Sequence, residues 1–251
     1  MHCLIVLAHP EEKSFNAQMA RVAKETFEAQ GHTAELCDLY REGFDPCEAL
    51  RHFPEPVAPD RFNAMTEQRH AAETGAVPPE VGRALERLER ADLLLLQFPM
   101  WWFSVPAILK GWLDRVFLYG RVYTSKARYD RGYFRGKRAL ISVTAGAPAS
   151  AFGPDGRCGD IDLLYWPLQF SLHYVGFTVL PPFYSYQVGG ISDDPELLRE
   201  RLEGQKAGLR RHLARLNDLE PLRFNGWDDW DENGRLRPGA PSYSPFMRHV
   251  A

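Results

Sequence analysis

The sequence predicts a doubly wound α/β domain with a five-stranded parallel sheet and helices on both faces. Short apolar runs alternate with amphipathic segments along the chain, which is the pattern of repeated strand and helix units. The runs are almost continuously apolar, as expected of strands covered on both faces. The 251 residues, 45% of them hydrophobic, suffice for a full core. We expect this domain to span residues 1–217, with residues 218–251 as a C-terminal extension that packs on the domain or on a dimer partner.

The first half of the chain supplies two strands and a long excursion. Residues 3–8 are an apolar run suited to a buried strand, and residues 16–30 follow with helical spacing until Gly31 ends the helix. Residues 33–40 alternate as a second strand. Residues 41–79 are rich in Pro, Arg and Glu, so we expect an irregular segment with one short helix. Long segments of this kind usually carry function or contacts.

The second half supplies three more strands. A helix is expected over residues 81–90, the third strand over residues 92–98, and then a helix that Ser104 caps and that runs to residue 119. The remaining elements are expected in the order strand, helix, strand and helix, over residues 137–144, 161–174, 176–180 and 195–217.

Charge and cysteine content argue against several functions. The formal net charge is −3, so the chain lacks the basic field that drives binding to nucleic acid. The N-terminus lacks the features of a signal peptide, and no apolar run approaches the roughly 20 residues of a membrane span. We therefore expect a cytoplasmic protein that does not insert into membranes. The four cysteines form no Cys-x-x-Cys pair, so no zinc site or other metal site is expected.

In a doubly wound sheet the ligand binds beyond the carboxyl ends of the strands, which directs attention to the loops after the first, third and fourth strands. The first loop leads into a helix N-terminus, whose free N–H groups favour a phosphate. His9, Ser14 and Asn16 add donors there. The alternatives are that Ser14 only caps the helix and that His9 is an ordinary polar loop residue. Neither a Gly-x-Gly-x-x-Gly motif nor a P-loop is present.

The other two loops offer flat apolar faces and backbone donors. Four bulky side chains follow one proline after the third strand, in the order Pro99, Met100, Trp101, Trp102 and Phe103. Because they cannot all point inward, we expect some of them to line a planar ligand; the alternative is packing under a neighbouring loop. The loop after the fourth strand, residues 144–148, is small enough for its backbone to approach a flat ring closely, although it is also a common turn.

Three motifs make a resemblance specific. Residues 8–10 read Ala-His-Pro, residues 14–16 read Ser-Phe-Asn, and residues 97–112 read Gln-Phe-Pro-Met-Trp-Trp-Phe-Ser-Val-Pro-Ala-Ile-Leu-Lys-Gly-Trp. With these motifs the chain resembles the NAD(P)H:quinone oxidoreductase family, the DT-diaphorase-like branch of the flavodoxin-like fold. Shorter matches extend the resemblance over roughly residues 1–217.

The resemblance implies a homodimer that binds FAD rather than FMN, takes hydride from NADH or NADPH and passes it by a ping-pong route to a quinone or related acceptor. It assigns to the cofactor His9, Ser14, Phe15, Asn16, Asn63, Pro99, Met100, Trp101, Trp102, Phe103, Thr144, Ala145, Gly146, Ala147 and Phe152. It assigns to the acceptor pocket Trp102, Phe103, Tyr123 and Ser125, with Tyr123 contributed by the partner subunit. Catalytic roles fall to Tyr123, Gly146, Ala147 and Cys158.

Three positions depart from the pattern of this family. Phe152 and Cys158 stand where better-known members have a tyrosine and a histidine that are proposed to stabilise charge on the reduced flavin. Neither side chain delivers a proton as histidine does near neutral pH. Ser125 replaces a second tyrosine of the acceptor pocket. The backbone N–H groups of Gly146 and Ala147 are then the expected carriers of the developing negative charge.

The C-terminal extension and the overall function each have alternatives. Phe224, Trp227 and Trp230 favour docking of the extension on a surface over a floppy terminus, and the resemblance places it near the active site of the partner subunit. Its acidic residues are also explained by solubility alone. Two other functions fit a flavin-binding fold: a regulatory subunit of a transport system with secondary quinone reductase activity, and a one-electron carrier.

Overall fold

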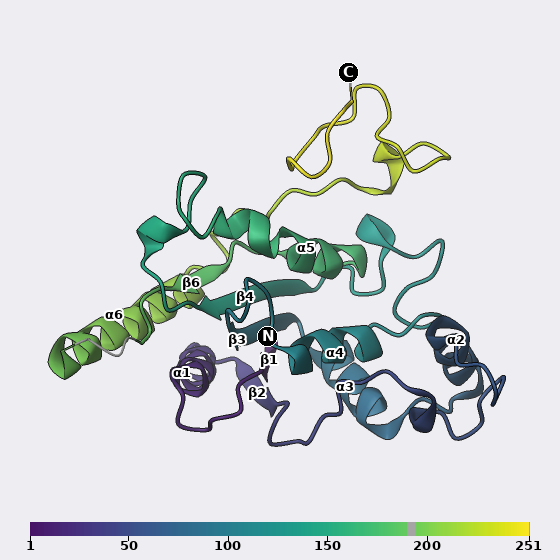
Figure 1. Cartoon of the computed structure of the whole chain (residues 1–251), viewed down its shortest axis with the longest axis horizontal. Coiled ribbons are helices and arrows are strands. Elements are labelled where there is room, and N and C mark those ends of the chain that lie inside the picture. The colour runs from purple at the N-terminus through teal and green to yellow at the C-terminus, as the bar shows by residue number, and fades with distance from the viewer. Residues whose placement is uncertain (190–193, 251) are drawn as a thin grey trace.

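The structure is a computed structural model that describes residues 1–189 and 194–250, and it confirms the predicted flavodoxin-like α/β fold. Helices and strands alternate over most of the chain (Figure 1). The strands are β1 (His2–Leu7), β2 (Thr33–Asp38), β3 (Leu93–Pro99), β4 (Arg138–Thr144), β5 (Thr178–Val179) and β6 (Phe183–Ser185). The helices are α1 (Phe15–Ala29), α2 (Ala64–Thr74), α3 (Pro79–Arg90), α4 (Ala107–Val116), α5 (Ile161–Tyr174) and α6 (Pro195–Ala214).

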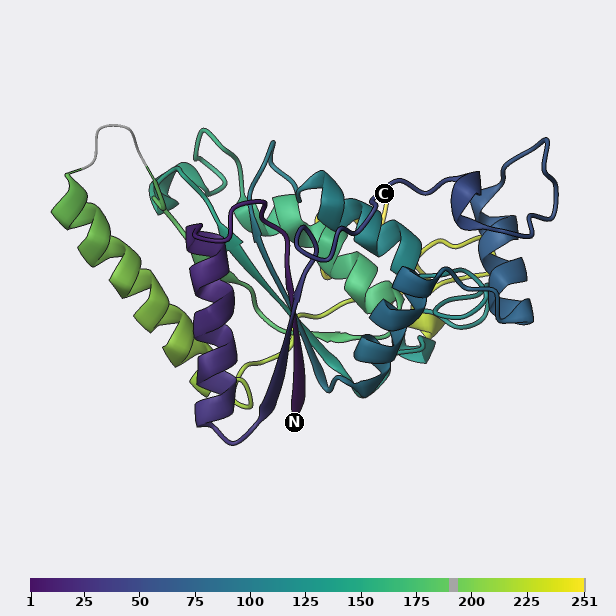
Figure 2. The same cartoon turned by 90° about the horizontal axis from the view of Figure 1, so that it is seen from below.

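The sheet is parallel throughout, in the order β2-β1-β3-β4-β5, with β6 also paired to β4. Strands β1 and β3 lie at its centre, and every residue of β3 is buried, which explains the unbroken apolar run in the sequence. Because the strands run the same way, their carboxyl ends share one edge, at the top of Figure 2. The loops expected to bind the ligand all leave the sheet at this edge.

Helices cover both faces of the sheet, as predicted. Figure 2 shows α1 and α6 on one side and α3, α4 and α5 on the other. Each face has its own core: Phe27 and Leu209 are fully buried on the first face, and Trp112 and Leu172 are buried on the second. Within the described part of the chain, no helix has both the length and the apolar character needed to cross a membrane.

The edge of the sheet beyond β4 differs from the prediction. A single strand over residues 176–180 was expected, but β5 has only two residues, and β6 continues the edge after an interruption. Ala139 is paired with Val179 and Ser142 with Phe183, so the outer strand contains one extra residue. Pro181 and Pro182 lie in this interval, and proline has no N–H group to donate to a neighbouring strand.

The start of α4 also corrects the prediction, because Ser104 does not cap this helix. The N-cap is Pro106, and the helix ends at Val116 rather than at residue 119. The backbone of Ser104 is instead paired with that of Trp101, in a tight hairpin. Several other ends differ by one to three residues; β2, for example, ends at Asp38 rather than at residue 40.

The long excursion after β2 contains the expected short helix, α2, and is fastened to α4 by a buried arginine. Arg115 is 1% exposed; it donates to the carbonyl of Asp45 (2.7 Å) and to the Glu80 carboxylate (2.5 Å). Backbone packing at Gly111 brings the same two segments closer still, since a Cβ atom there would lie 2.1 Å from the carbonyl oxygen of Pro46. The excursion is therefore an ordered part of the domain.

The C-terminal extension passes over α5, as the yellow chain above that helix in Figure 1 shows. The ring of Phe224 stacks on that of His173, with centroids 4.9 Å apart, and Phe246 stacks on Trp166 at 5.1 Å. Asn225 is fully buried and holds the extension together by donating to Asp229 (3.0 Å) and to the carbonyl of Pro241 (2.8 Å).

Two glycines inside helices give a matched test of this packing. We expect Gly111→Ala to lower the free energy of unfolding by about 2 kcal/mol or more, because the new methyl group collides with backbone. Gly82→Ala, in α3, has open space around the added Cβ and should raise the free energy of unfolding by up to about 1 kcal/mol. Urea unfolding at one protein concentration measures both. Equal effects of the two substitutions would contradict the close approach of Pro46 to α4.

Candidate functional site

A buried amide at the carboxyl edge of the sheet connects three strand ends. Asn16, 4% exposed, donates from Nδ2 to Thr144 Oγ1 (2.9 Å), and its Oδ1 accepts from Gln97 Nε2 (2.8 Å). Gln97 lies in β3 and Thr144 ends β4, while Asn16 opens the helix that follows β1. The three side chains therefore fix the first, third and fourth strands relative to one another at the predicted ligand edge.

The three loops expected from the sequence lie next to one another. The N–H of Met100 donates to the carbonyl of Thr144 (2.8 Å), which joins the third-strand loop to the fourth. The rings of His9 and Trp101 are 6.0 Å apart, which joins the first-strand loop to the third. Residues that are 44 and 92 positions apart in the sequence are in contact, and the three loops thus form one continuous rim.

The first-strand loop presents several hydrogen-bond donors. The N–H of Glu11 donates to His9 Nδ1 (3.0 Å), so the proton of the neutral ring is on Nε2. Burial lowers the pKa of His9, which favours this neutral form. At the start of α1, the N–H groups of Phe15 and Asn16 have no partner among the described residues. Ser14 Oγ accepts from the N–H of Ala17 (3.1 Å), so the capping role of this serine is confirmed.

The aromatic loop is a two-residue hairpin with strained backbone. Trp101 and Ser104 exchange both backbone hydrogen bonds (3.2 and 3.0 Å), and the residues between them have positive φ, 49° at Trp102 and 57° at Phe103. Asparagine and glycine normally occupy these positions, and bulky residues there cost on the order of 1–3 kcal/mol each. Trp102 is also 95% exposed and Phe103 50% exposed. The hairpin thus holds two aromatic rings outside the core at an energetic cost.

The loop after β4 offers backbone hydrogen-bond donors rather than side chains. The N–H of Ala145 donates to Ser185 (2.8 Å), and the carbonyls of Ala145 and Ala147 accept from Val188 and Gln187 (both 3.2 Å). The N–H groups of Gly146 and Ala147 have no partner within the described chain. A Cβ atom on Gly146 would meet nothing within 4 Å, so this backbone is open to a bound group.

The residues that replace the family's tyrosine and histidine lie in the segment after this loop. The ring of Phe152 is 5.6 Å from that of Tyr186. Cys158 is a half-buried free thiol whose N–H donates to the carbonyl of Ala151 (2.9 Å). Sequence reasoning missed the tyrosines packed here, among them Tyr184, which donates to Asp162 (3.0 Å). The signal was the alternating run Phe-Tyr-Ser-Tyr at residues 183–186, which forms β6 and the residue after it.

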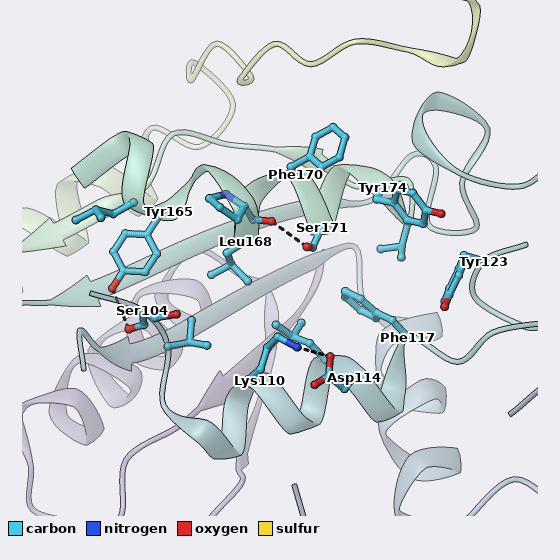
Figure 3. Close-up of a pocket in the computed structure, with 15 residues that line it drawn as sticks. Ser104, Lys110, Asp114, Phe117, Tyr123, Tyr165, Leu168, Phe170, Ser171 and Tyr174 are labelled. Carbon is cyan, nitrogen blue, oxygen red and sulfur yellow. Dashed lines mark hydrogen bonds and ion pairs between the residues drawn. The ribbon is translucent and has the colours of Figure 1, made fainter. Parts of the chain in front are cut away.

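A groove of about 580 Å³ runs between α4 and α5, away from the hairpin. Figure 3 shows Ser104 and Tyr165 at one end of it and Tyr123 and Tyr174 at the other. The hydroxyl of Tyr165 donates to the carbonyl of Ser104 (3.4 Å), which closes the end next to the hairpin. Within one chain, Tyr123 is therefore separated from the aromatic hairpin by the length of this groove.

Two other predicted residues lie away from the rim of loops. Asn63 is the N-cap of α2 and accepts from the N–H of Thr66 (3.0 Å); α2 lies beyond α3 and α4 from the sheet (Figures 1 and 2). Ser125 is exposed, two residues after Tyr123. A search of the described residues finds no cluster of His, Cys, Asp or Glu suited to a metal ion.

The fold agrees with comparisons to known proteins. The family model of the flavodoxin-like fold matches residues 1–207. NAD(P)H dehydrogenase (quinone) 1 of Cavia porcellus is 38% identical over 223 residues, which cover 88% of this chain and 79% of the relative. Ribosyldihydronicotinamide dehydrogenase (quinone) of Mus musculus is 40% identical over 193 residues, covering 76% and 84%. A solved Klebsiella pneumoniae structure, assigned as a quinone reductase, is 33% identical with a TM-score of 0.88 and covers 97% of each chain.

These similarities define the class of protein, a doubly wound α/β domain of the flavodoxin-like fold. The chain belongs to the flavodoxin-like fold family, in the branch of the NAD(P)H:quinone oxidoreductases. The resemblance seen in the sequence motifs is thereby confirmed.

Substitutions of Ser14 separate its capping role from the binding of an anion at α1. Ser14→Ala should lower the free energy of unfolding by about 1 kcal/mol, whereas Ser14→Asp should preserve it, because aspartate caps as well as serine. If a phosphate binds at the free N–H groups, Ser14→Asp should weaken flavin binding more than Ser14→Ala, through repulsion of like charges. Chemical unfolding and flavin fluorescence titration measure the two effects. Equal flavin affinity in both variants would contradict the binding of a phosphate at this end of α1.

Proposed function

We propose that this protein is an FAD-dependent NAD(P)H:quinone oxidoreductase that works as a homodimer and transfers hydride in two steps by a ping-pong route. One observation carries the proposal: a strained hairpin holds Trp102 almost fully exposed beside a loop in which the N–H groups of Gly146 and Ala147 have no partner among the described residues. Strain of this kind persists where function requires it. A flat ring with polar atoms on one edge would stack against the exposed aromatic side chains of the hairpin and accept hydrogen bonds from the N–H groups of the other loop.

The residues present fit a flavin with phosphates. The N–H groups of Phe15 and Asn16 and the Nε2–H of His9 are donors without acceptors among the described residues, at the positive end of the α1 dipole. A phosphate supplies the missing acceptors. The preference for FAD over FMN rests on the family resemblance of residues 9, 15 and 16, which match its pyrophosphate and adenosine half.

A bound flavin supplies the chemistry of accepting a hydride and giving it up again. The chain contributes geometry, since Trp102 and Phe103 form one wall of a slot that NAD(P)H and the acceptor occupy in turn. The N–H groups of Gly146 and Ala147 stabilise negative charge at the polar edge of the ring. Phe152 cannot deliver a proton and Cys158 is a poor substitute for histidine, so the stabilisation of negative charge falls to the backbone N–H dipoles.

The homodimer follows from the distance between Tyr123 and the hairpin. The acceptor pocket of the family needs both, but one chain holds them at opposite ends of the α4–α5 groove (Figure 3). A second copy seated on this groove brings its own Tyr123 to the hairpin of the first. The groove has a largely apolar lining, including Leu113, Phe117 and Leu168, as expected of a surface that a second copy covers.

We place the enzyme in the cytoplasm, since all four cysteines are free thiols. The regulatory subunit of a transport system is the second candidate function, because it needs the same flavin site and only slow turnover. The acceptor is a quinone or a related planar compound, and the donor is NADH or NADPH.

The purified protein should be yellow, and chromatography of the released cofactor should identify FAD. Steady-state oxidation of NADH or NADPH with menadione should then show turnover on the order of 1 s⁻¹ or faster, the ordinary range of enzymes. The matched control is protein freed of flavin, which should be inactive until FAD is returned. Flavin binding with negligible turnover would favour the regulatory subunit, and protein that stays colourless with excess FAD or FMN would end the proposal.

Mixed dimers test whether the active site is shared. We expect a hairpin variant, Trp102→Gly with Phe103→Gly, and a second variant, Tyr123→Ala, each to lose most menadione reduction as homodimers. Because a mixed dimer has one site with both lesions and one with neither, coexpression should restore about a quarter of the wild-type activity. The wild type coexpressed with the hairpin variant is the reference. A mixture no more active than its parents would place each active site within one chain.

A further inference from the structure

Arg128, in the segment between α4 and β4, carries a positive charge that the described chain does not neutralise. Its guanidinium is half-buried, and its Nη1 donates to the hydroxyl of Tyr174 (3.1 Å). No described carboxylate lies within ion-pair distance of it, whereas its neighbour Arg131 pairs with Asp228 (2.8 Å). Removing a cation from water without a counter-ion is costly, so this position favours the arrival of an anion.

Aromatic rings surround this guanidinium on several sides. Its Cζ lies 5.9 Å from the ring centre of Tyr129, 5.8 Å from that of Tyr174 and 5.4 Å from that of Trp227. Rings stabilise a cation through their faces but accept none of its in-plane hydrogen bonds. The Nε–H of Arg128 is buried without a partner, and the indole N–H of Trp230 is buried in the same unpaired state.

Arg128 and Trp230, the residues that carry these two buried donors, both line one cavity of about 690 Å³. Its walls include the rings of Tyr129, Trp227 and Trp230. Arg237 and two carboxylates, Asp231 and Glu232, also line it, and the Asp231 carboxylate already accepts from the N–H groups of Asn233 (2.9 Å) and Arg235 (2.8 Å). Flat apolar walls suit a planar ring, and the guanidinium of Arg128, which has no described counter-ion, suits a negatively charged oxygen. The chemistry of the cavity therefore matches a planar aromatic acid.

The C-terminal extension holds this cavity in shape. The N–H of Trp227 donates to Asp130 (2.6 Å), and the carbonyl of Asn225 accepts from His173 Nε2 (3.0 Å), so the extension is anchored on both sides of the aromatic walls. Tyr129 has a φ of 58°, a left-handed conformation that is unfavourable for a tyrosine and that its neighbours must enforce. The cavity is therefore formed before any ligand binds.

The cavity adjoins the acceptor end of the α4–α5 groove. Phe170 lines both of them, and the ring of Tyr174 lies 5.7 Å from that of Tyr123. In the proposed dimer, where Tyr123 reaches the hairpin of the partner subunit, Arg128 stands at the border of the same acceptor chamber.

We propose that Arg128 and the aromatic rings of the C-terminal extension form a recognition site for planar aromatic acids, and that it makes acceptors with a carboxylate or sulfonate group preferred over neutral ones. The acceptor preference rests on the proposed function; the binding site itself rests on the unpaired charge of Arg128 and on the aromatic walls of the cavity.

A pair of acceptors with the same ring system tests the preference. The ratio of kcat/KM for 1,4-naphthoquinone-2-sulfonate to that for menadione should fall about 10-fold or more in Arg128→Met, mainly through loss of the sulfonate, because a hydrogen bond between charged groups is removed. Arg128→Lys should keep part of the preference. Arg131→Met is the matched control, since Arg131 lies 5.2 Å from the same Trp227 ring but is already paired, and it should leave the ratio unchanged. An equal fall in both methionine variants would assign the effect to anchoring of the extension and overturn the proposal.

Binding without turnover separates this inference from the proposed function. Calorimetry with naphthalene-2-sulfonate should show an affinity about 10-fold or more lower in Arg128→Met than in the wild type. If the wild type reduces no quinone but still binds this probe through Arg128, the proposed function fails and the binding site stands. Equal affinity in the two proteins overturns the site. Light scattering that shows Arg128→Met as a monomer would also overturn the site, because a carboxylate of the partner subunit would then be the counter-ion of Arg128.

Discussion

The hydrogen bonds of Asn16 are the constraint on which the site depends. Its amide accepts from Gln97 and donates to Thr144, and both partners are buried. An amide in this position has few alternatives, because an unpaired polar group in a dry interior costs more than a misplaced apolar one. The three strand ends therefore keep a fixed spacing, and the loops that follow them form one rim rather than three independent turns.

Two parts of the molecule maintain features that are unfavourable in isolation. The hairpin holds Trp102 and Phe103 at positive φ and in solvent, and the extension encloses an arginine that has no counter-ion. Rigid surroundings make both possible: Met100 is bonded to Thr144 on one side of the hairpin, and Asn225 fixes the extension over α5. Features that lower stability but are held firmly in place are those that a bound ligand or partner compensates.

The site is spread over distant parts of the chain. The first-strand loop and the hairpin lie at the carboxyl edge of the sheet, while Tyr123 and Arg128 lie in the segment after α4, at the far end of a groove with a largely apolar lining. A second copy joins the two halves in our proposal. The extension then shapes the half that meets the acceptor, which explains how one flavodoxin-like domain acquires a preference among acceptors without changing its cofactor site.

The sequence by itself determined the doubly wound sheet, the helices on both faces and the identity of the three loops, because apolar periodicity is a local property and the carboxyl edge follows from parallel strands. It misplaced the start of α4 and missed β6, since Ser104 and residues 183–185 take their conformations from partners in other segments. The residues of the aromatic loop were identifiable from their composition, but the positive φ of Trp102 was not. Only the tertiary structure decided that Asn16 bonds to Gln97 and Thr144, and that Arg128 lacks a carboxylate, because contacts across 80 or more positions depend on how the layers pack.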